Sequence, residues 1–243
     1  MEYQKINTLF KRDDKNIIIP SQYTCEEFKY LKDNIWECSE KIDGCNIRIY
    51  ITIVPGEGEN PWVYDIVFMG RTSKANIPIH LWKKLKDIFY KIDWSKIFPE
   101  LTPEDKVCLY GEGYGNKIQN KVGYRYIKND VNFILFDVKY NQWWLTRKDC
   151  EDIANKCNID IVPLVGYMTI PQAIEYVKKG FKSNISEDKD LDAEGLVLKT
   201  PFGLKFKNGE RIITKIKYCD FEKFKNVYGD NPNPNQIINP KYK

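Results

Sequence analysis

The segment Lys41-Ile42-Asp43-Gly44-Cys45-Asn46-Ile47-Arg48-Ile49-Tyr50-Ile51 carries the most informative pattern of the chain. From Ile47 onward, isoleucines recur at every second position, which predicts a half-buried strand. Asp43-Gly44 just before it predicts a turn, so Lys41 lies where the chain enters a strand. A lysine amine can attack a phosphorus centre if its neighbours keep it uncharged. Taken alone, the pattern is more typical of an exposed turn.

Composition limits the class of protein. The chain has 243 residues, of which 42% are hydrophobic and 14% aromatic, enough for one large domain or for two lobes around a cleft. No apolar run approaches the roughly 20 residues that cross a bilayer, and the N-terminus is unlike a secretory signal. We therefore expect no membrane partner and a cytoplasmic location, which for a viral protein means the host cytoplasm.

The cysteine and histidine content of the chain excludes one common kind of metal site. The seven cysteines contain no Cys-x-x-Cys pair, and His80 is the only histidine, which rules out a zinc site built from several histidines. Residues 199–243 hold ten Lys or Arg against four Asp or Glu. This bias suits a phosphate-bearing partner such as a nucleic acid, although a solvated lysine surface would give the same count.

The periodicities predict an α+β fold of antiparallel sheets flanked by helices. The residues from Gly111 to Gly115 read as a glycine-rich turn. We expect one domain over residues 1–230 and a tail over 231–243. Strands are predicted at 47–54, 63–69, 107–110, 131–138, 143–145, 194–199 and 211–217, and helices at 79–92, after Thr146, after Thr169 and at 221–227.

Charged and aromatic residues gather at the ends of these predicted strands. A bound nucleotide needs such a set, because cations neutralise its phosphates, an aromatic ring stacks on its base, and carboxylates hold a metal or the ribose hydroxyls. Each residue has a simpler explanation too: a solvated loop for Glu112, the wet face of a sheet for the lysines, the core for Phe136. The residues are Lys41, Asp43, Arg71, Glu112, Phe136, Asp137, Glu194, Lys215 and Lys217.

Six segments in order make the nucleotide interpretation specific. They resemble motifs I, Ia, III, IIIa, IV and V of the covalent nucleotidyltransferase superfamily of polynucleotide ligases and capping enzymes. Within it, the chain is most similar to ATP-dependent RNA ligases of the phage-type, T4 RNA ligase 2-like group. The segments are Glu40-Lys41-Ile42-Asp43-Gly44-Cys45-Asn46, Gly70-Arg71-Thr72, Tyr110-Gly111-Glu112-Gly113-Tyr114-Gly115, Phe136-Asp137-Val138, Glu194-Gly195-Leu196-Val197-Leu198-Lys199 and Ile213-Thr214-Lys215-Ile216-Lys217.

The resemblance implies an ATP-grasp-like adenylation domain, without a C-terminal oligonucleotide-binding barrel, in which Lys41 becomes linked to AMP. It assigns the α-phosphate to Lys215 and Lys217, and the adenine to Phe136. Arg71 and Glu112 belong to the ribose region, and Glu194, with Glu112, to Mg²⁺ or Mn²⁺. Further residues of the nucleotide site are Glu40, Asp43, Gly44, Asn46 and Arg48.

The implied reaction joins RNA strands. AMP would pass from Lys41 to a 5′-phosphate of RNA, and a 3′-hydroxyl would then displace it. An accessory end-healing or RNA-binding protein is a possible partner. The alternatives are a DNA ligase, an mRNA-capping guanylyltransferase that uses GTP, and a non-catalytic RNA-binding module on a degenerate ligase fold.

Overall fold

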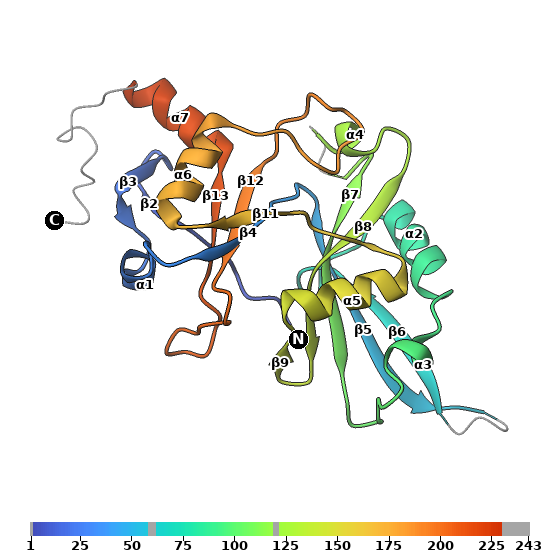
Figure 1. Cartoon of the computed structure of the whole chain (residues 1–243). Helices are drawn as coiled ribbons and strands as arrows, with labels where there is room; N and C mark the ends of the chain where they lie inside the picture. Colours follow the sequence, from blue (N-terminus) through green and yellow to red (C-terminus); the bar gives the residue numbers. More distant parts are fainter. Residues whose placement is uncertain (1, 58–61, 119–121, 230–243) are drawn as a thin grey trace. The chain divides into compact units, whose positions relative to one another are not determined.

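The computed structural model describes residues 2–57, 62–118 and 122–229. The chain divides into two compact units (Figure 1), and each is described by itself. Unit 1 comprises the residues up to Tyr3, Ile42–Val162 and Ile185–Asp188; unit 2 comprises Gln4–Lys41, Pro163–Asn184 and the chain from Lys189 onward. A single domain over 1–230 stays a prediction, and the predicted tail 231–243 lies outside the described residues. Among the described residues, no helix is long and apolar enough to cross a membrane.

Unit 1 is built on a mainly antiparallel sheet with the strand order β10-β8-β7-β5-β6, and β9 pairs with β8. Helices α2 and α5 pack on one face of this sheet (Figure 1). The elements are β5 (Cys45–Pro55), β6 (Trp62–Met69), α2 (Ile79–Phe89), α3 (Trp94–Ile97), β7 (Val107–Gly115), α4 (Gly123–Tyr126), β8 (Val131–Tyr140), β9 (Trp143–Trp144), α5 (Arg147–Cys157) and β10 (Asp160–Ile161).

The alternation of β5 decides which face of this sheet is apolar. Ile47, Ile49 and Ile51 point to the helices and are buried with Leu81 and Phe89 of α2. Burial of each such side chain stabilises the fold by about 1.5–3 kcal/mol. Because successive side chains of a strand point to opposite faces, the residues between these isoleucines lie on the second face. That face is therefore the one that carries the polar residues of β5.

The glycine-rich segment after Tyr110 is not a turn, so that prediction is wrong. Strand β7 continues to Gly115, with a shift of register between Tyr110 and Gly111. A Cβ on Gly111 would collide with the ring of Phe133 and with a neighbouring carbonyl. The glycines therefore serve close packing within a sheet, which sequence alone does not distinguish from a turn.

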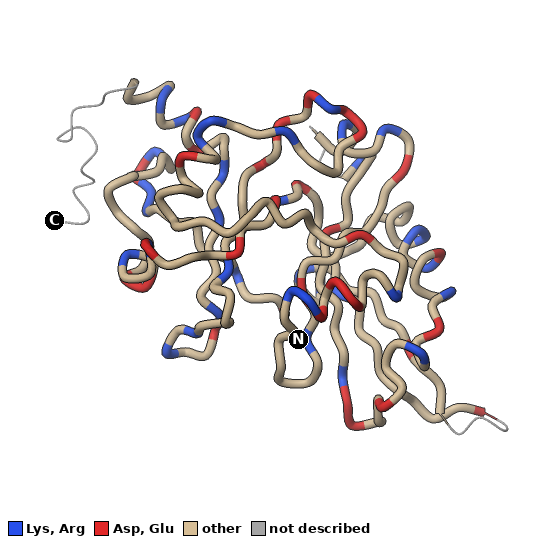
Figure 2. Tube along the Cα trace, viewed as in Figure 1, with Lys and Arg blue, Asp and Glu red and all other residues tan. Residues whose placement is uncertain are grey.

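Unit 2 contains a five-stranded sheet with the order β1-β13-β12-β4-β11 and a separate β2-β3 pair. Trp36 and Cys38 of β4 and Leu196 of β12 form its core with the helices. Positions of charged residues are spread along the described part of the chain (Figure 2). The elements are β1 (Asn7–Thr8), β2 (Phe10–Arg12), β3 (Ile18–Tyr23), α1 (Glu26–Tyr30), β4 (Trp36–Glu40), β11 (Leu164–Met168), α6 (Ile170–Lys179), β12 (Gly195–Lys199), β13 (Ile213–Lys217) and α7 (Tyr218–Tyr228).

The fold class is confirmed as α+β with largely antiparallel sheets. Strands β5 and β6 pair antiparallel as predicted, and so do β12 and β13. Thr146 and Thr169 both form complete capping boxes at the starts of α5 and α6. Two strand pairs are parallel, β1 with β13 and β10 with β8. The strands and helix before Lys41 carry no clear periodicity and were not predicted.

Candidate functional site

Three of the predicted residues come together in unit 2 because of its sheet order. Strand β12 pairs antiparallel with both β4 and β13, with Leu196 opposite Glu40 and Gly195 opposite Lys217. These pairings bring three positions of the chain to the same end of the sheet: the end of β4, the start of β12 and the end of β13. Lys41 follows β4, and its backbone N–H donates to the carbonyl of Gly195 at 2.9 Å.

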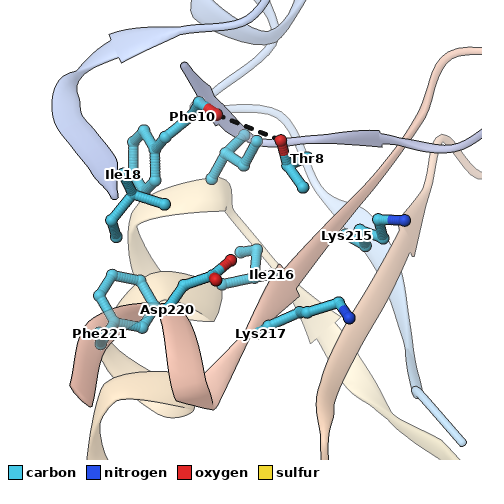
Figure 3. A pocket seen from close by; sticks show the side chains of 9 residues that line it. Thr8, Phe10, Ile18, Lys215, Ile216, Lys217, Asp220 and Phe221 are labelled. Atoms are coloured by element: carbon cyan, nitrogen blue, oxygen red, sulfur yellow. Dashed lines mark hydrogen bonds between the residues drawn. The ribbon is translucent and has the colours of Figure 1, made fainter. Parts of the chain in front are cut away.

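Lys215 and Lys217 lie on the same face of β13, and Ile216 between them is buried in the core (Figure 3). Both lysines help to line a shallow pocket, together with Thr8 and Asp220. Asp220 forms an ion pair with Arg12 at 2.6 Å. The same pocket is thus lined by two lysines and by a carboxylate that Arg12 already pairs with.

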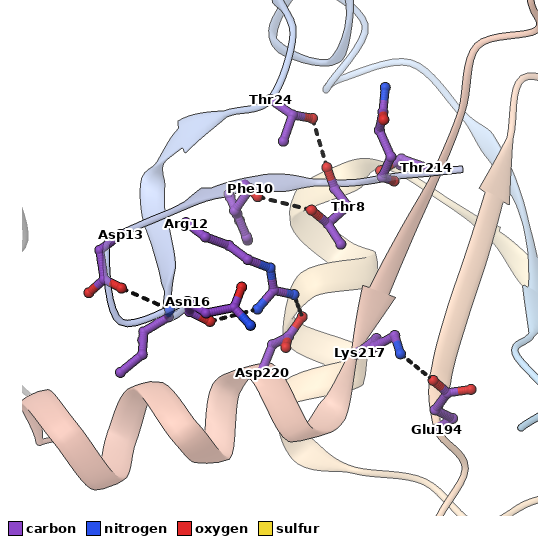
Figure 4. A network of polar contacts seen from close by, with 12 residues as sticks. Thr8, Phe10, Arg12, Asp13, Asn16, Thr24, Glu194, Thr214, Lys217 and Asp220 are labelled. Atoms are coloured by element: carbon purple, nitrogen blue, oxygen red, sulfur yellow. Dashed lines mark hydrogen bonds and ion pairs between the residues drawn. The ribbon is translucent and has the colours of Figure 1, made fainter. Parts of the chain in front are cut away.

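Glu194 bridges two lysines, Lys41 and Lys217. One carboxylate oxygen accepts from Lys217 Nζ at 2.6 Å (Figure 4), and the other pairs with Lys41 Nζ. The side chains of Lys41, Glu194 and Lys217 are 20%, 15% and 29% exposed. Water therefore only partly screens the attraction between their charges. Burial lowers the pKa of Lys217, but the hydrogen bond and charge of Glu194 outweigh it and leave this pKa raised.

Glu40 is placed differently from its neighbour Lys41. Its side chain is 1% exposed. One oxygen accepts from Ser183 Oγ at 2.5 Å, and the other accepts from the backbone N–H of Asn184 at 2.9 Å. A buried carboxylate is tolerated only with such partners. Glu40 therefore anchors the segment after α6, and the structure gives it a structural contact where a nucleotide contact is predicted.

The second face of the unit 1 sheet carries Asn46 and Glu112, which are opposite each other in the pairing of β5 with β7. Gly44 lies over this pair, since a Cβ there would meet the carbonyl of Gly113 and the Cγ of Glu112. The Oδ1 atom of Asn46 is buried and has no hydrogen-bond partner among the described residues. A buried orphan acceptor costs about 1–3 kcal/mol, which a ligand donor would recover.

Arg48 is buried and 2% exposed. Its Nε donates to the carbonyl of Gly70 at 2.8 Å, and Nη1 donates to the hydroxyl of Tyr50 at 3.0 Å. The guanidinium thus holds the end of β6, from which the exposed side chain of Arg71 extends. Arg48 thus bonds to the backbone next to Arg71, and its assignment to the nucleotide site stays a prediction.

Phe136 is half-buried, whereas Phe133 and Leu135 of the same strand belong to the core. Its ring meets the ring of Tyr3 edge-on, with centroids 5.1 Å apart. The hydroxyl of Tyr3 donates to Asp137 Oδ2 at 2.5 Å. Phe136 therefore lies outside the main apolar core but packs against Tyr3, a residue that sequence reasoning missed, and its stacking on adenine stays a prediction. An aromatic residue near a terminus carries no periodic signal.

The backbone N–H of Asp43 donates to the hydroxyl of Tyr126 at 3.3 Å. Tyr126 ends α4 and is 1% exposed. It therefore supports the turn after Lys41 and is not available to stack on a nucleic-acid base. Tyr124 of the same helix is 56% exposed.

The two predicted metal carboxylates lie in different units, Glu112 in unit 1 and Glu194 in unit 2. Within the described ranges, no group of three or more His, Cys, Asp or Glu side chains is arranged to hold a metal ion. Both oxygens of Glu194 already contact lysines. The metal assignment stays a prediction.

Comparison with known proteins identifies the family. The model of the RNA ligase family matches residues 34–217, which include all six motif segments. The chain belongs to the RNA ligase family. Its membership of the nucleotidyltransferase superfamily follows, whereas the T4 RNA ligase 2-like subgroup stays a prediction.

Solved RNA ligases share the fold. Naegleria gruberi RNA ligase with PPi is 19% identical with a TM-score of 0.60, and the match covers 93% of this chain and 58% of that chain. The E312A mutant of that ligase, with AMP and Mn, is 18% identical with a TM-score of 0.59 and coverages of 92% and 58%. The chain therefore spans less than two thirds of these relatives. No curated protein matched it.

Proposed function

We propose that this protein is an ATP-dependent RNA ligase that works through a lysyl-AMP intermediate on Lys41. The observation that carries the proposal is the trio of Lys41, Glu194 and Lys217, which are paired with one another at one end of the unit 2 sheet. The chain that carries this trio belongs to the RNA ligase family. Related solved ligases are described with ATP and Mn or with AMP and Mn, which supports ATP and a divalent metal as cofactors here.

In the first step, Nζ of Lys41 attacks the α-phosphorus of ATP. The Nζ–P bond forms as the bond from phosphorus to the pyrophosphate oxygen breaks, and pyrophosphate leaves with the electron pair. The amine must lose a proton to attack, and the carboxylate of Glu194 is in hydrogen-bond contact to accept it. Lys217, released from Glu194, can then contact phosphate oxygens on which negative charge develops.

The later steps transfer the same AMP. A 5′-phosphate oxygen of RNA displaces Lys41 from the adenylate phosphorus and forms a pyrophosphate linkage. A 3′-hydroxyl then attacks the RNA phosphorus, forming the phosphodiester bond and releasing AMP. Lys215, on the same face as Lys217, supplies a second cation for these phosphates.

One or two carboxylates would be enough to hold a divalent metal ion together with bound ATP. Mg²⁺ is commonly held by one or two carboxylates together with substrate phosphates and water, so no preformed protein cage is required. Glu194 could bind it once ATP phosphates occupy the lysines, and Glu112 with the orphan Asn46 Oδ1 offers oxygen atoms on unit 1. The bound metal would neutralise the pyrophosphate leaving group.

The decisive experiment incubates the purified chain with α-labelled ATP and Mg²⁺ or Mn²⁺. We expect a labelled, acid-labile protein adduct that maps to Lys41 by mass spectrometry and disappears in Lys41→Ala. Lys178→Ala is the matched control, because Lys178 is an exposed, ion-paired lysine on α6. An adduct that survives in Lys41→Ala, or that never forms, would refute the proposal.

The same preparation separates the alternatives. Sealing of nicked RNA over nicked DNA distinguishes an RNA ligase from a DNA ligase. Preference for GTP would indicate a capping guanylyltransferase. RNA binding without any adenylate would indicate a non-catalytic module.

A further inference from the structure

Beyond the reaction site, one ordered hairpin of unit 2 has no role in the chemistry above. Strands β12 and β13 are connected by residues 200–212, seen in orange-red beyond the ends of these strands in Figure 1. The N–H of Gly203 donates to Thr200 O at 3.0 Å, and that of Phe206 donates to Glu210 O at 2.8 Å. Two successive turns therefore fix the backbone of the hairpin, which we call the basic hairpin.

The base of the basic hairpin is fixed to the core of unit 2. Phe206 packs against Phe28, with ring centroids 6.2 Å apart. Arg211 is 6% exposed, and its backbone N–H and C=O both bond to the side chain of Gln4, at 3.0 and 2.8 Å. A group displayed by this hairpin is consequently held in place before any ligand arrives.

Phe202 is displayed in this way. It is 92% exposed, the largest value of any large hydrophobic residue among those described. It follows Pro201 in the first turn, and Gly203 completes that turn with φ of +62°. Proline at the second position and glycine at the fourth are typical of a tight β-turn. A rigid turn thus presents a whole phenyl ring to solvent, where it contributes nothing to the core.

Several cationic residues lie close to Phe202 in the sequence. Residues 199–211 contain four Lys or Arg and one acid, Glu210, and Figure 2 shows lysine and arginine colour on this loop. Lys205 and Lys207 are exposed, whereas the carboxylate of Glu210 accepts from the side chain of Asn208 at 3.0 Å. An exposed aromatic ring beside lysines suits a single-stranded nucleic acid, whose bases stack and whose phosphates attract cations.

We propose that the basic hairpin is an RNA-docking element, in which a base stacks on Phe202 and phosphates contact Lys205 and Lys207. The inference rests on the proposed function for its choice of RNA. Strand β12 separates Glu194 from the hairpin by five residues, which at about 3.4 Å per residue is roughly 17 Å. Bases stacked at about 3.4 Å would bridge this distance with roughly five nucleotides, so the hairpin contacts RNA away from the reacting end.

The test measures binding of a 5′-phosphorylated, fluorescein-labelled 20-nucleotide single-stranded RNA by anisotropy, without ATP. Loss of one base–aromatic stack in Phe202→Ala should raise Kd roughly 5- to 150-fold, and Phe202→Trp should restore binding. The double variant Lys205→Gln/Lys207→Gln should reduce the slope of log K against log salt by about 1.4, since each phosphate contact on a single strand contributes about 0.7.

Matched controls come from unit 1. Trp143→Ala removes a ring that is 74% exposed, and Lys91→Gln/Lys148→Gln removes two exposed lysines; neither should change Kd or the salt slope beyond the small effect of net charge.

Unchanged Kd in Phe202→Ala, with wild-type circular dichroism, would overturn the proposal and leave a protein partner as the occupant. Equal weakening by the unit 1 controls would overturn it too, as non-specific attraction. Because this assay contains no ATP, its failure is distinct from failure of Lys41 adenylation.

Discussion

Replacing Glu194 by Gln tests the bridged lysines directly. The substitution keeps the size of the side chain and removes the charge that two ammonium groups share. Lys41 and Lys217 would then face each other's charge across a neutral amide, whose NH₂ group cannot accept a hydrogen bond. The variant should therefore be less stable than wild type, apart from any effect on catalysis.

The size of the effect follows from burial. Exposed ion pairs contribute about 0.2–1 kcal/mol, and breaking a buried pair costs about 3–5 kcal/mol. The three side chains are 15–29% exposed, which places each ion pair between these limits. Because the substitution breaks both ion pairs, we expect the free energy of unfolding to fall by about 2–4 kcal/mol at pH 7.

The dependence on pH provides a second, independent signature. The pKa of Lys217 in the folded protein is raised above its ordinary value of 10.5. A raised lysine pKa stabilises the folded state fully below the ordinary value, and this stabilisation is lost as pH rises through the folded value. The stability difference between wild type and Glu194→Gln should therefore narrow above about pH 10.5.

Urea unfolding of both proteins, followed by tryptophan fluorescence from pH 7 to 12, measures these quantities. Glu175→Gln is the matched control, because it breaks an exposed ion pair with Lys178 and should change stability by less than about 1 kcal/mol. A Glu194→Gln variant within about 0.5 kcal/mol of wild type, or a difference that stays constant to pH 12, would refute the bridged arrangement.

Three further predictions concern other parts of the fold. Glu40→Ala should lower the free energy of unfolding by about 3 kcal/mol or more in urea titrations, because Ser183 and Asn184 lose a buried acceptor. Gly111→Ala should lower it by about 1–3 kcal/mol or more, measured in the same way, because the added methyl group overlaps the Phe133 ring. Iodoacetamide at pH 8 should label the exposed Cys219 before the buried thiols, as read by peptide mass spectrometry, and labelling should quicken toward pH 9 as thiolate forms. Burial raises the pKa of Cys38, Cys45 and Cys157 to about 12 and that of Cys108 to about 11.

Local signals in the sequence carried much of the fold. The capping boxes at Thr146 and Thr169 involve residues three apart, so they are visible without knowledge of the tertiary structure. The alternation from Ile47 to Ile51 predicts both the strand and its buried face. The nature of Gly111 could not be predicted, because the Phe133 ring that requires a glycine there is 22 positions away and arrives only through strand pairing.

In the candidate site too, sequence motifs predict some of the residues, whereas their contacts are seen only in the tertiary structure. The ordered motifs identified Lys41, Glu194 and Lys217, but the charge between the lysines comes from the order β4-β12-β13. The partners of Glu40 and Asp137 are more than 130 positions away, at Ser183 and Tyr3. No pattern in the sequence specifies such contacts. The structure shows Glu40 bonded to Ser183 and Asn184, and its assignment to the nucleotide site stays a prediction.

The bridging carboxylate changes how the reactive lysine is to be understood. Attack on phosphorus requires neighbours that keep the amine of Lys41 uncharged. In the structure, Glu194 lies between that amine and Lys217 and offsets both charges. A triphosphate carries the same kind of charge and must compete with Glu194 for these lysines. Binding of ATP would thus free the carboxylate at the moment when Lys41 needs a proton acceptor. The ion pair and the reaction would then be alternative uses of the same three groups, which couples activation of the amine to arrival of its substrate.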